Sequence, residues 1–201
     1  MGGVRRYMQE APPNLILIGF MATGKSTIGR RCAEQLGFRF RDSDTLIERR
    51  ANQSISSIFS DYGEDAFRKM EREAIKDLSK GSHVVIATGG GAPMIPENVV
   101  NLRECGVIVL LMLTPEEILK RAGNRRTRPI LNEAENPAEK IRQLMDIRVP
   151  VYSNAADAIV DSTGLDCEET TRRVLDAYQI CRDSISWKQV DGKARRAEKW
   201  I

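Results

Sequence analysis

The sequence predicts an α/β protein in which helices cover both faces of a parallel sheet. Short runs rich in valine and isoleucine alternate along the chain with segments whose apolar residues recur at helical spacing. Most of these runs are apolar at every position, as strands covered on both faces are. Prolines fall near the expected helix starts, where their missing N–H loses no intrahelical partner. Together these observations predict a three-layer α/β/α sandwich.

Five strands and six helices are expected between residues 14 and 181. The expected strands are Leu15–Ile18, Phe38–Phe40, Val84–Ala87, Val107–Leu113 and Ala158–Val160. All but the second of them are expected to be buried on both faces. The expected helices are Ser26–Leu36, Phe67–Leu78, Pro96–Glu104, Pro115–Arg121, Pro137–Arg148 and Glu168–Ile180. Residues 1–13 and the tail 182–201 lie outside this pattern, so we expect them to be flexible or loosely docked.

Composition and charge fit one globular domain. The 201 residues are 41% hydrophobic and 29% charged, as in folded soluble proteins. The longest apolar run, Val107–Leu113, is far shorter than the ~20 residues of a membrane span. No apolar stretch precedes Pro12, so a secretory signal is not expected either. We therefore expect a monomeric cytoplasmic protein without a membrane contact.

The cysteines and the basic residues add two further expectations. Four cysteines without a Cys-x-x-Cys pair, beside a single histidine, predict reduced thiols rather than a zinc site. Residues 182–201 hold six basic and three acidic side chains, so the tail accounts for the net charge of +3 of the whole chain. Because acids are interspersed among its basic residues, the tail does not predict nucleic-acid binding.

A glycine-rich stretch follows the first apolar run directly. Within Gly19-Phe20-Met21-Ala22-Thr23-Gly24-Lys25-Ser26-Thr27, the two glycines, the lysine and the serine have the spacing of a P-loop. In that motif, successive backbone N–H groups converge on a phosphate at a helix N-terminus. The lysine reaches the outer phosphates, and the hydroxyl ligates magnesium. The stretch therefore predicts a nucleotide site.

A P-loop alone does not identify the phosphate acceptor, but two other motifs bear on it. The Asn-Lys-x-Asp stretch typical of guanine specificity is absent. The run Val84–Ala87 ends in Thr88-Gly89-Gly90-Gly91, where bare glycines let a second substrate lie against the backbone. Asp42-Ser43-Asp44 follows the short strand and offers one carboxylate to the metal and another to an acceptor hydroxyl. A helix-capping aspartate beside a solvated one is the alternative.

Three arginines stand near these motifs. Arg68 lies in a helical segment, Arg128 precedes Pro129, and Arg148 lies in Arg148-Val149-Pro150-Val151-Tyr152. Guanidinium groups hold carboxylates and phosphates through two parallel hydrogen bonds, which lysine does poorly. Any one of them alone would be read as a surface arginine. Together they predict a site for an anionic substrate.

The chain resembles shikimate kinases from about Asn14 to Val160. Six ordered motifs carry the resemblance: Ile18 to Met21 with Gly24 to Arg30; Asp42-Ser43-Asp44; Ile58-Phe59 with Gly63-Glu64, Phe67-Arg68 and Glu71; Thr88-Gly89-Gly90-Gly91-Ala92; Arg128-Pro129; and Arg148 with Pro150 and Tyr152. The resemblance implies a P-loop, nucleoside-monophosphate-kinase-like fold with a central parallel five-stranded sheet. It also implies an acceptor-binding helical segment over about 43–71 and a lid over about 122–133.

The resemblance further implies an activity: transfer of a phosphoryl group from ATP to the 3-hydroxyl of shikimate, giving shikimate 3-phosphate in aromatic amino-acid biosynthesis. Mg²⁺ would accompany ATP, held by Ser26 and, through water, by Asp42. The catalytic residues would be Lys25, Asp44 and Arg128. The implied ATP-binding residues are Gly19, Ala22, Thr23, Gly24, Lys25, Ser26, Thr27, Arg121 and Arg128.

The implied shikimate-binding residues complete this assignment. They are Asp44, Phe59, Phe67, Arg68, Gly89, Gly90, Gly91 and Arg148. By the resemblance, Asp44 faces the reacting hydroxyl, Arg68 and Arg148 grip the carboxylate, and Glu71 orients Arg68. The two phenylalanines form the apolar walls of the pocket.

Two departures and two rivals accompany this assignment. The family's P-loop usually has a third glycine at the position of Ala22, and the lid carries three arginines, Arg125, Arg126 and Arg128, any of which could contact phosphate. A related kinase for another small hydroxy acid, such as gluconate, would also need carboxylate-gripping arginines. A catalytically lapsed binding or regulatory module is the alternative from outside the enzymes.

Overall fold

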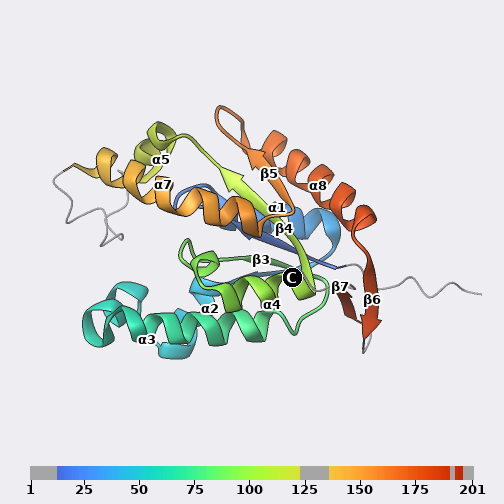
Figure 1. Ribbon diagram of the computed structural model, residues 1–201, viewed down its shortest axis with the longest axis horizontal. Coiled ribbons are helices and arrows are strands. Elements are labelled where there is room, and N and C mark those ends of the chain that lie inside the picture. The colour runs from blue at the N-terminus through green and yellow to red at the C-terminus, as the bar shows by residue number, and fades with distance from the viewer. Residues whose placement is uncertain (1–12, 123–135, 191–192, 197–201) are drawn as a thin grey trace, which may run out of the picture.

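A computed structural model describes residues 13–122, 136–190 and 193–196 and contains a five-stranded parallel sheet (Figure 1). The strand order is β2-β3-β1-β4-β5, and all four neighbouring pairs are parallel. The strands are β1 (Asn14–Ile18), β2 (Arg39–Asp42), β3 (Val84–Ala87), β4 (Gly106–Met112) and β5 (Ala158–Asp161). The expected strands differ from these by at most two residues at either end, so the predicted fold class is confirmed.

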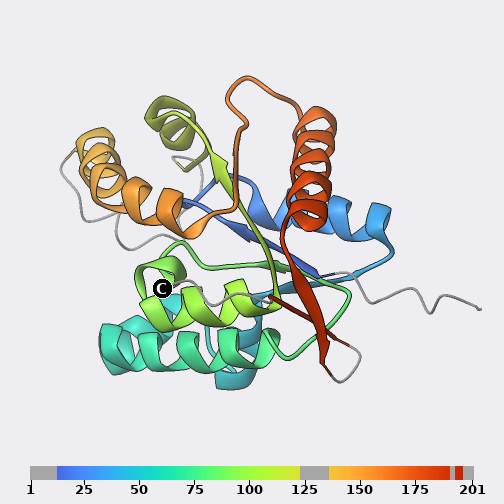
Figure 2. The same ribbon diagram turned by 45° about the vertical axis from the view of Figure 1, so that its right-hand side comes forward.

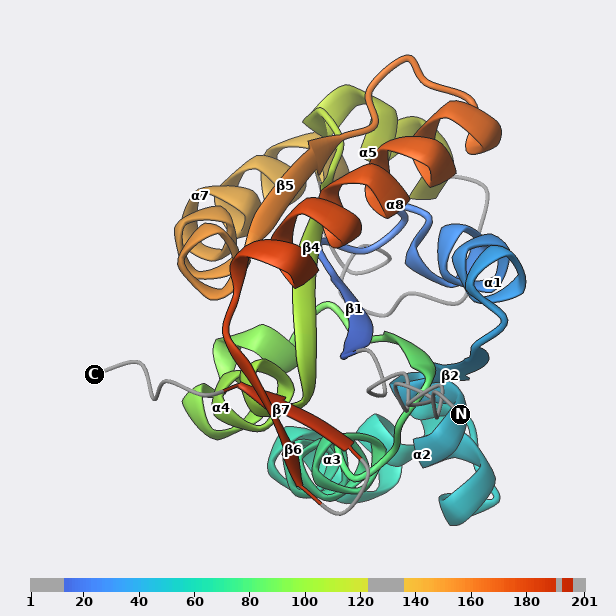
Figure 3. The same ribbon diagram turned by 90° about the vertical axis from the view of Figure 1, so that its right-hand side faces the viewer.

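Helices cover both faces of this sheet, as Figure 3 shows. The helices are α1 (Lys25–Leu36), α2 (Ser43–Ala51), α3 (Ile55–Leu78), α4 (Pro96–Cys105), α5 (Pro115–Ala122), α7 (Pro137–Ala155) and α8 (Cys167–Ser184), with a 3₁₀ turn η1 (Ala92–Met94). Alternate residues of β1 face opposite layers. Leu15 and Leu17 pack with α1 and α8, whereas Ile16 and Ile18 pack with α3, α4, α5 and α7. The core therefore has two apolar layers separated by the sheet.

Three elements differ from their expected form. β5 is an edge strand with Ile159 52% exposed, so the expectation that it is buried on both faces was wrong. α7 continues through Pro150 to Ala155, seven residues beyond the expected end at Arg148. α3 begins at Ile55, twelve residues before the expected start, and bends at Gly63, which has φ 78°. The apolar spacing that predicts a helix is regular only after this bend, so it indicated only the second half of α3.

The tail does not fit the expectation of a mobile or loosely docked segment. α8 runs to Ser184, and β6 (Trp187–Val190) pairs antiparallel with β7 (Lys193–Arg196). This C-terminal hairpin leaves α8 and lies against α4 and β4 (Figure 2). The division of the chain at residue 181 and the flexibility of residues 1–13 stay predictions, and residues 1–12 lie outside the described part.

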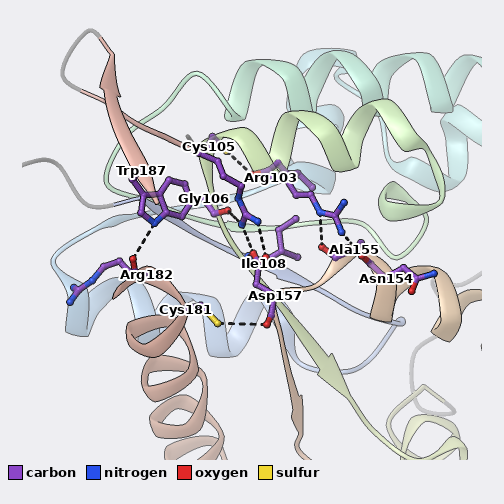
Figure 4. A network of polar contacts seen from close by, with 12 residues as sticks. Arg103, Cys105, Gly106, Ile108, Asn154, Ala155, Asp157, Cys181, Arg182 and Trp187 are labelled. Atoms are coloured by element: carbon purple, nitrogen blue, oxygen red, sulfur yellow. Dashed lines mark hydrogen bonds and ion pairs between the residues drawn. The ribbon is translucent and has the colours of Figure 1, made fainter. Parts of the chain in front are cut away.

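The hairpin is attached by a buried ion pair. Arg196 Nη2 lies 2.6 Å from Asp157 Oδ2, and the two side chains are 3% and 8% exposed. The Arg196 guanidinium also lies 5.4 Å from the centre of the Trp187 ring. Asp157 Oδ2 accepts a hydrogen bond from Ile108 N–H, which joins the network to β4 (Figure 4). The hairpin therefore sits at the amino ends of β4 and β5.

Within the described residues, no helix is long and apolar enough to cross a membrane. All four cysteines are free thiols, and Cys32 and Cys105 are buried in the core.

Candidate active site

A cavity of about 1200 Å³ opens along the carboxyl ends of the parallel strands. The loops that follow β1, β2, β3 and β5 all line it, together with parts of α3 and α7. In open α/β sheets, ligands bind at this edge because the strands end there and the loops diverge. The C-terminal hairpin lies at the opposite edge of the sheet.

The predicted P-loop surrounds the beginning of α1. Lys25 is 9% exposed, and its Nζ donates to the carbonyls of Gly19 at 2.8 Å and Phe20 at 2.7 Å. The first turn of α1 has no acidic residue and no side-chain cap, whereas α4, α5 and α8 each carry a glutamate there. The amino end of α1 is thus suited to an anion, since no carboxylate of its own first turn competes for its N–H groups.

Ala22 occupies a backbone conformation that favours glycine. Its φ is +62°, in the left-handed region. A side chain in this region costs roughly 1 kcal/mol. A glycine, which the family usually has at this position, would adopt this backbone conformation without that cost. This chain has alanine there, the smallest chiral side chain. Ala22, Thr23 and Thr27 all line the cavity, as expected.

Asp42 caps α2 and also contacts the P-loop. Its Oδ1 accepts hydrogen bonds from the N–H groups of Asp44 and Thr45, and its Oδ2 accepts one from Ser26 Oγ at 2.6 Å. The capping role left open by the sequence is therefore real, but it does not exclude the other. A hydroxyl and a carboxylate are oxygen ligands of the kind that Mg²⁺ prefers. The pair fits a magnesium ion beside a bound nucleotide.

Two carboxylate oxygens converge on Gly89. Asp44 Oδ1 and Glu71 Oε1 are both buried, and neither has a hydrogen-bond partner in the described part of the chain. A Cβ on Gly89 would lie 2.5 Å from the first oxygen and 3.1 Å from the second. Buried polar atoms without partners are rare in folded proteins. Two buried acceptors without partners in the described residues thus lie at the bare backbone of Gly89.

The protonation of Asp44 follows from this crowding. Burial and, after it, the negative charges of Asp42 and Glu71 raise the pKa of Asp44 to about 6, against the lowering effect of Lys25. Burial also raises the pKa of Glu71, against the lowering effect of Arg68. Asp44 is thus ionised at neutral pH but titrates within the range where enzymes work.

Arg68 is held in place by two glutamates. Its Nη1 lies 2.8 Å from Glu71 Oε2, and its Nη2 lies 2.9 Å from Glu64 Oε1. Glu71 is fully buried, so it fixes the guanidinium firmly. A side chain on Gly91 would collide with this group, since its Cβ would lie 2.8 Å from Arg68 Cζ. Arg68 therefore lies directly over the triple-glycine loop.

Arg148 reaches the same cavity from α7. Its guanidinium carbon lies 5.6 Å from the centre of the Phe20 ring, and its charge acts on Glu71 together with that of Arg68. Phe59 and Phe67 line the cavity on the α3 side, with their ring centres 4.7 Å apart. The structure therefore brings the predicted acceptor-site residues, which are spread over about a hundred positions of sequence, into one cavity.

The expected lid follows α5 in the chain. Arg121 lines the cavity from the last turn of α5, 3.7 Å from Glu117. Arg128, and the lid range 122–133 apart from Ala122, lie outside the described residues. Their roles stay predictions.

Two groups of cavity or loop residues were missed in the sequence. Ser162, Leu165, Asp166, Cys167 and Thr170 line the nucleotide side of the cavity from the turn after β5 and the start of α8. Ser43, Asn98 and Tyr152 bind the backbone of the triple-glycine loop. Neither group has a recognisable spacing in the sequence, although Ser43 and Tyr152 belong to two of the motifs that resemble shikimate kinases.

Comparisons with known proteins agree with this geometry. The shikimate kinase family matches residues 21–179 of the chain. The chain belongs to the shikimate kinase family. A shikimate kinase of Thermoanaerobacter pseudethanolicus is 43% identical over 165 residues, which cover 82% of this chain and 95% of the relative. The resemblance seen in the sequence motifs is thereby confirmed.

Solved structures place the fold within the same family. A shikimate kinase from Acinetobacter baumannii in complex with shikimate has a TM-score of 0.81 and 35% identity, covering 88% of this chain and 97% of that one. A gluconokinase from Sinorhizobium meliloti has a TM-score of 0.52 and 15% identity, with the same two coverages. The gluconokinase shares the fold alone, so shikimate kinases are the nearer relatives in both sequence and structure.

Proposed function

We propose that the cavity of this shikimate kinase family member binds ATP at the P-loop and shikimate at the triple-glycine loop, and that Asp44 lies where the two meet. The observation that carries this proposal is the pair of unpartnered oxygens, Asp44 Oδ1 and Glu71 Oε1, over Gly89. A ligand that satisfies them must offer hydrogen-bond donors, and neighbouring hydroxyl groups are one such set. Shikimate carries three on its ring, and its carboxylate matches the arginines on the other side of the loop.

The nucleotide half is built around α1. The N–H groups of the P-loop surround the phosphates, and Lys25 exchanges its two carbonyl contacts for the outer phosphates of ATP. Ser26 and Asp42 would hold Mg²⁺, with Asp42 acting through water, and the ion would supply positive charge against the transferred phosphoryl group. Arg121 lies beside the adenine, and Arg128 completes the charge neutralisation from the lid.

The acceptor half fixes one hydroxyl for reaction. Arg68 and Arg148 grip the carboxylate, far from the reacting oxygen, and thereby orient the ring. The 3-hydroxyl oxygen forms a bond to the γ-phosphorus while the bond to the bridging oxygen of ADP breaks. The hydroxyl proton passes to the Asp44 carboxylate, which is ionised above about pH 6. The products are ADP and shikimate 3-phosphate.

We also propose a monomer that works in the cytoplasm. The four free thiols fit a reducing compartment.

An ADP-release assay against a panel of hydroxy acids tests the proposal. We expect saturable, Mg²⁺-dependent ADP release with shikimate and none above background with gluconate. Lys25→Ala should abolish turnover and keep the fold, which circular dichroism would check. Preference for gluconate would support the rival kinase, and nucleotide and shikimate binding without turnover would support a lapsed module.

A further inference from the structure

The triple-glycine loop is held by buried side chains from separate helices. Gly89 N–H donates to Ser43 Oγ at 2.9 Å, and Tyr152 Oη donates to the carbonyl of Gly90. Asn98 Nδ2 donates to the carbonyl of Ala92 at 3.0 Å, at the end of the loop. Ser43 and Asn98 are fully buried, and Tyr152 is 1% exposed. Three helices thus bind the backbone of three residues, Gly89, Gly90 and Ala92, within this short loop.

We call Ser43, Asn98 and Tyr152 the anchors of the loop. Two of them stand beside residues that we assign to shikimate binding. Ser43 immediately precedes Asp44 in the first turn of α2. Tyr152 follows Arg148 by four residues on α7, so the two side chains share one face of that helix. Each anchor therefore joins the loop to the helix that carries one substrate-binding side chain. Asn98 has no such neighbour.

The lack of side chains in the loop makes these anchors necessary. Three consecutive glycines have wide conformational freedom and no side chains with which to pack. The loop must nevertheless place Gly89 within contact of Asp44 and Gly91 within contact of Arg68. The Tyr152 hydroxyl is protonated at neutral pH, as an ordinary tyrosine is, and burial raises its pKa further, so it can donate to Gly90.

We propose that Ser43 and Tyr152 are positioning residues, which set the distances from the Gly89–Gly90 backbone to Asp44 on one side and to Arg148 on the other. This inference rests on the proposed function, because it concerns the same shikimate site. Tyr152 acts on ground-state binding of the acceptor, since Arg148 contacts the carboxylate. Ser43 acts on the chemical step as well, since Asp44 faces the reacting hydroxyl.

The test compares Tyr152→Phe and Ser43→Ala with the parent by steady-state kinetics. For Tyr152→Phe we expect the KM for shikimate to rise about tenfold, the change produced by losing one buried hydrogen bond. Its kcat and its KM for ATP should stay within about twofold, because the P-loop is untouched. For Ser43→Ala we expect kcat to fall about tenfold together with a rise in the KM for shikimate.

Matched controls separate positioning from stability. Tyr178 is also 1% exposed and donates to a backbone carbonyl, that of Pro13 at 2.6 Å, but on α8 and far from the triple-glycine loop. Ser79 is buried and donates to the carbonyl of Ile75 at 2.9 Å. Tyr178→Phe and Ser79→Ala should lower Tm without changing any KM.

Two results would overturn the proposal. One is a KM for shikimate in Tyr152→Phe within twofold of the parent value. The other is an equal rise in the KM for ATP, which would indicate general loosening of the fold. If Tyr152→Phe is too unstable for kinetics at the assay temperature, the shikimate-induced rise in Tm replaces KM; an unchanged rise contradicts the proposal. The activity of the parent protein with shikimate tests the proposed function, whereas the variants test the positioning roles of Ser43 and Tyr152.

Discussion

Asp44 combines three properties that rarely occur in one side chain. It lies in the first turn of α2, it has a buried oxygen without a hydrogen-bond partner among the described residues, and its pKa is raised to about 6. The cause is burial first and the neighbouring carboxylates second. An aspartate in this state is costly to the fold and useful to the reaction, because it can accept a proton near neutral pH.

The pH dependence of the reaction should reflect this group. We expect kcat/KM for shikimate to fall about tenfold per pH unit below about pH 6, because protonated Asp44 cannot accept the hydroxyl proton. ATP affinity, measured by equilibrium binding over the same range, should change little. An acidic limb centred near pH 4, the ordinary aspartate value, would contradict the assignment.

The stability of the fold should depend on the same proton. Because its folded-state pKa lies above the ordinary value of 3.8, the contribution of Asp44 to stability is full below about pH 4 and is lost as the pH rises through about 6. At pH 8, Asp44→Asn should therefore raise the free energy of unfolding, by on the order of 1–2 kcal/mol after allowance for partial exposure.

Thermal unfolding of Asp44→Asn at pH 8 and pH 4 checks this expectation. The gain should be large at pH 8 and small at pH 4, and turnover should be lost at both. Asp61 is exposed and bonds only to Gln53 among the contacts described, so Asp61→Asn serves as a control that changes the same chemical group. A lower Tm for Asp44→Asn at pH 8 would contradict the account.

The site residues that the sequence predicted share one property: each stands in a short motif whose neighbouring residues indicate its chemical role. Gly19, Lys25 and Ser26 stand in a fixed spacing, and the three glycines stand together at a strand end. Ser43 and Tyr152 bind backbone groups that are 46 and 62 positions away in the sequence. No local pattern reports such a bond, so only the folded chain identifies them.

At the scale of elements, the C-terminal hairpin lies outside the strand–helix pattern of the sequence and was therefore expected to be flexible or loosely docked. Its Arg196 is nevertheless buried against Asp157. The partner is 39 positions away and sits outside every motif. Helices and strands with regular apolar spacing were predictable because burial of one face dictates that spacing. α2 and the first half of α3 pack mainly on each other in a small separate cluster. Apolar spacing did not indicate them, and only the resemblance implied a helical segment there, over about 43–71.

Removing Arg196 should weaken the fold without acting on the chemistry. Arg196→Ala leaves the Asp157 carboxylate buried and unpaired, and breaking a buried pair typically costs about 3–5 kcal/mol. We expect a marked fall in Tm. Because the hairpin lies at the sheet edge opposite the cavity, kcat/KM for shikimate should stay within a few-fold at temperatures where the variant is folded.

Deletion of residues 184–201 should act in the same direction, with lower stability and a similar catalytic rate. Arg50 forms an exposed ion pair with Asp77 at 2.9 Å, in which the side chains are 47% and 40% exposed. Arg50→Ala is therefore the matched control, expected to change stability by less than about 1 kcal/mol. An Arg196→Ala variant as stable as the parent would mean that the hairpin is not held by this pair.

At the scale of the whole molecule, the parallel topology assembles the site. The motifs after β1, β2 and β3 meet because the carboxyl ends of neighbouring parallel strands lie at one edge of the sheet. The crossing of α3 and α7 over that edge then brings Arg68 and Arg148 together, although they are 80 positions apart in the sequence. The predicted fold was sufficient to place the strand-end motifs, but the convergence of the two arginines depends on how the helices pack.

The central claim is that these two guanidinium groups grip the carboxylate of shikimate across the triple-glycine loop. The KM for shikimate in Arg148→Lys and Arg68→Lys, at saturating ATP, tests it most directly. Lysine keeps the charge and loses the paired hydrogen bonds, at a cost of ~1.5–3 kcal/mol. We therefore predict that the KM for shikimate rises roughly ten- to hundredfold in each variant while the KM for ATP is almost unchanged. An unchanged KM for shikimate in both variants would contradict the account.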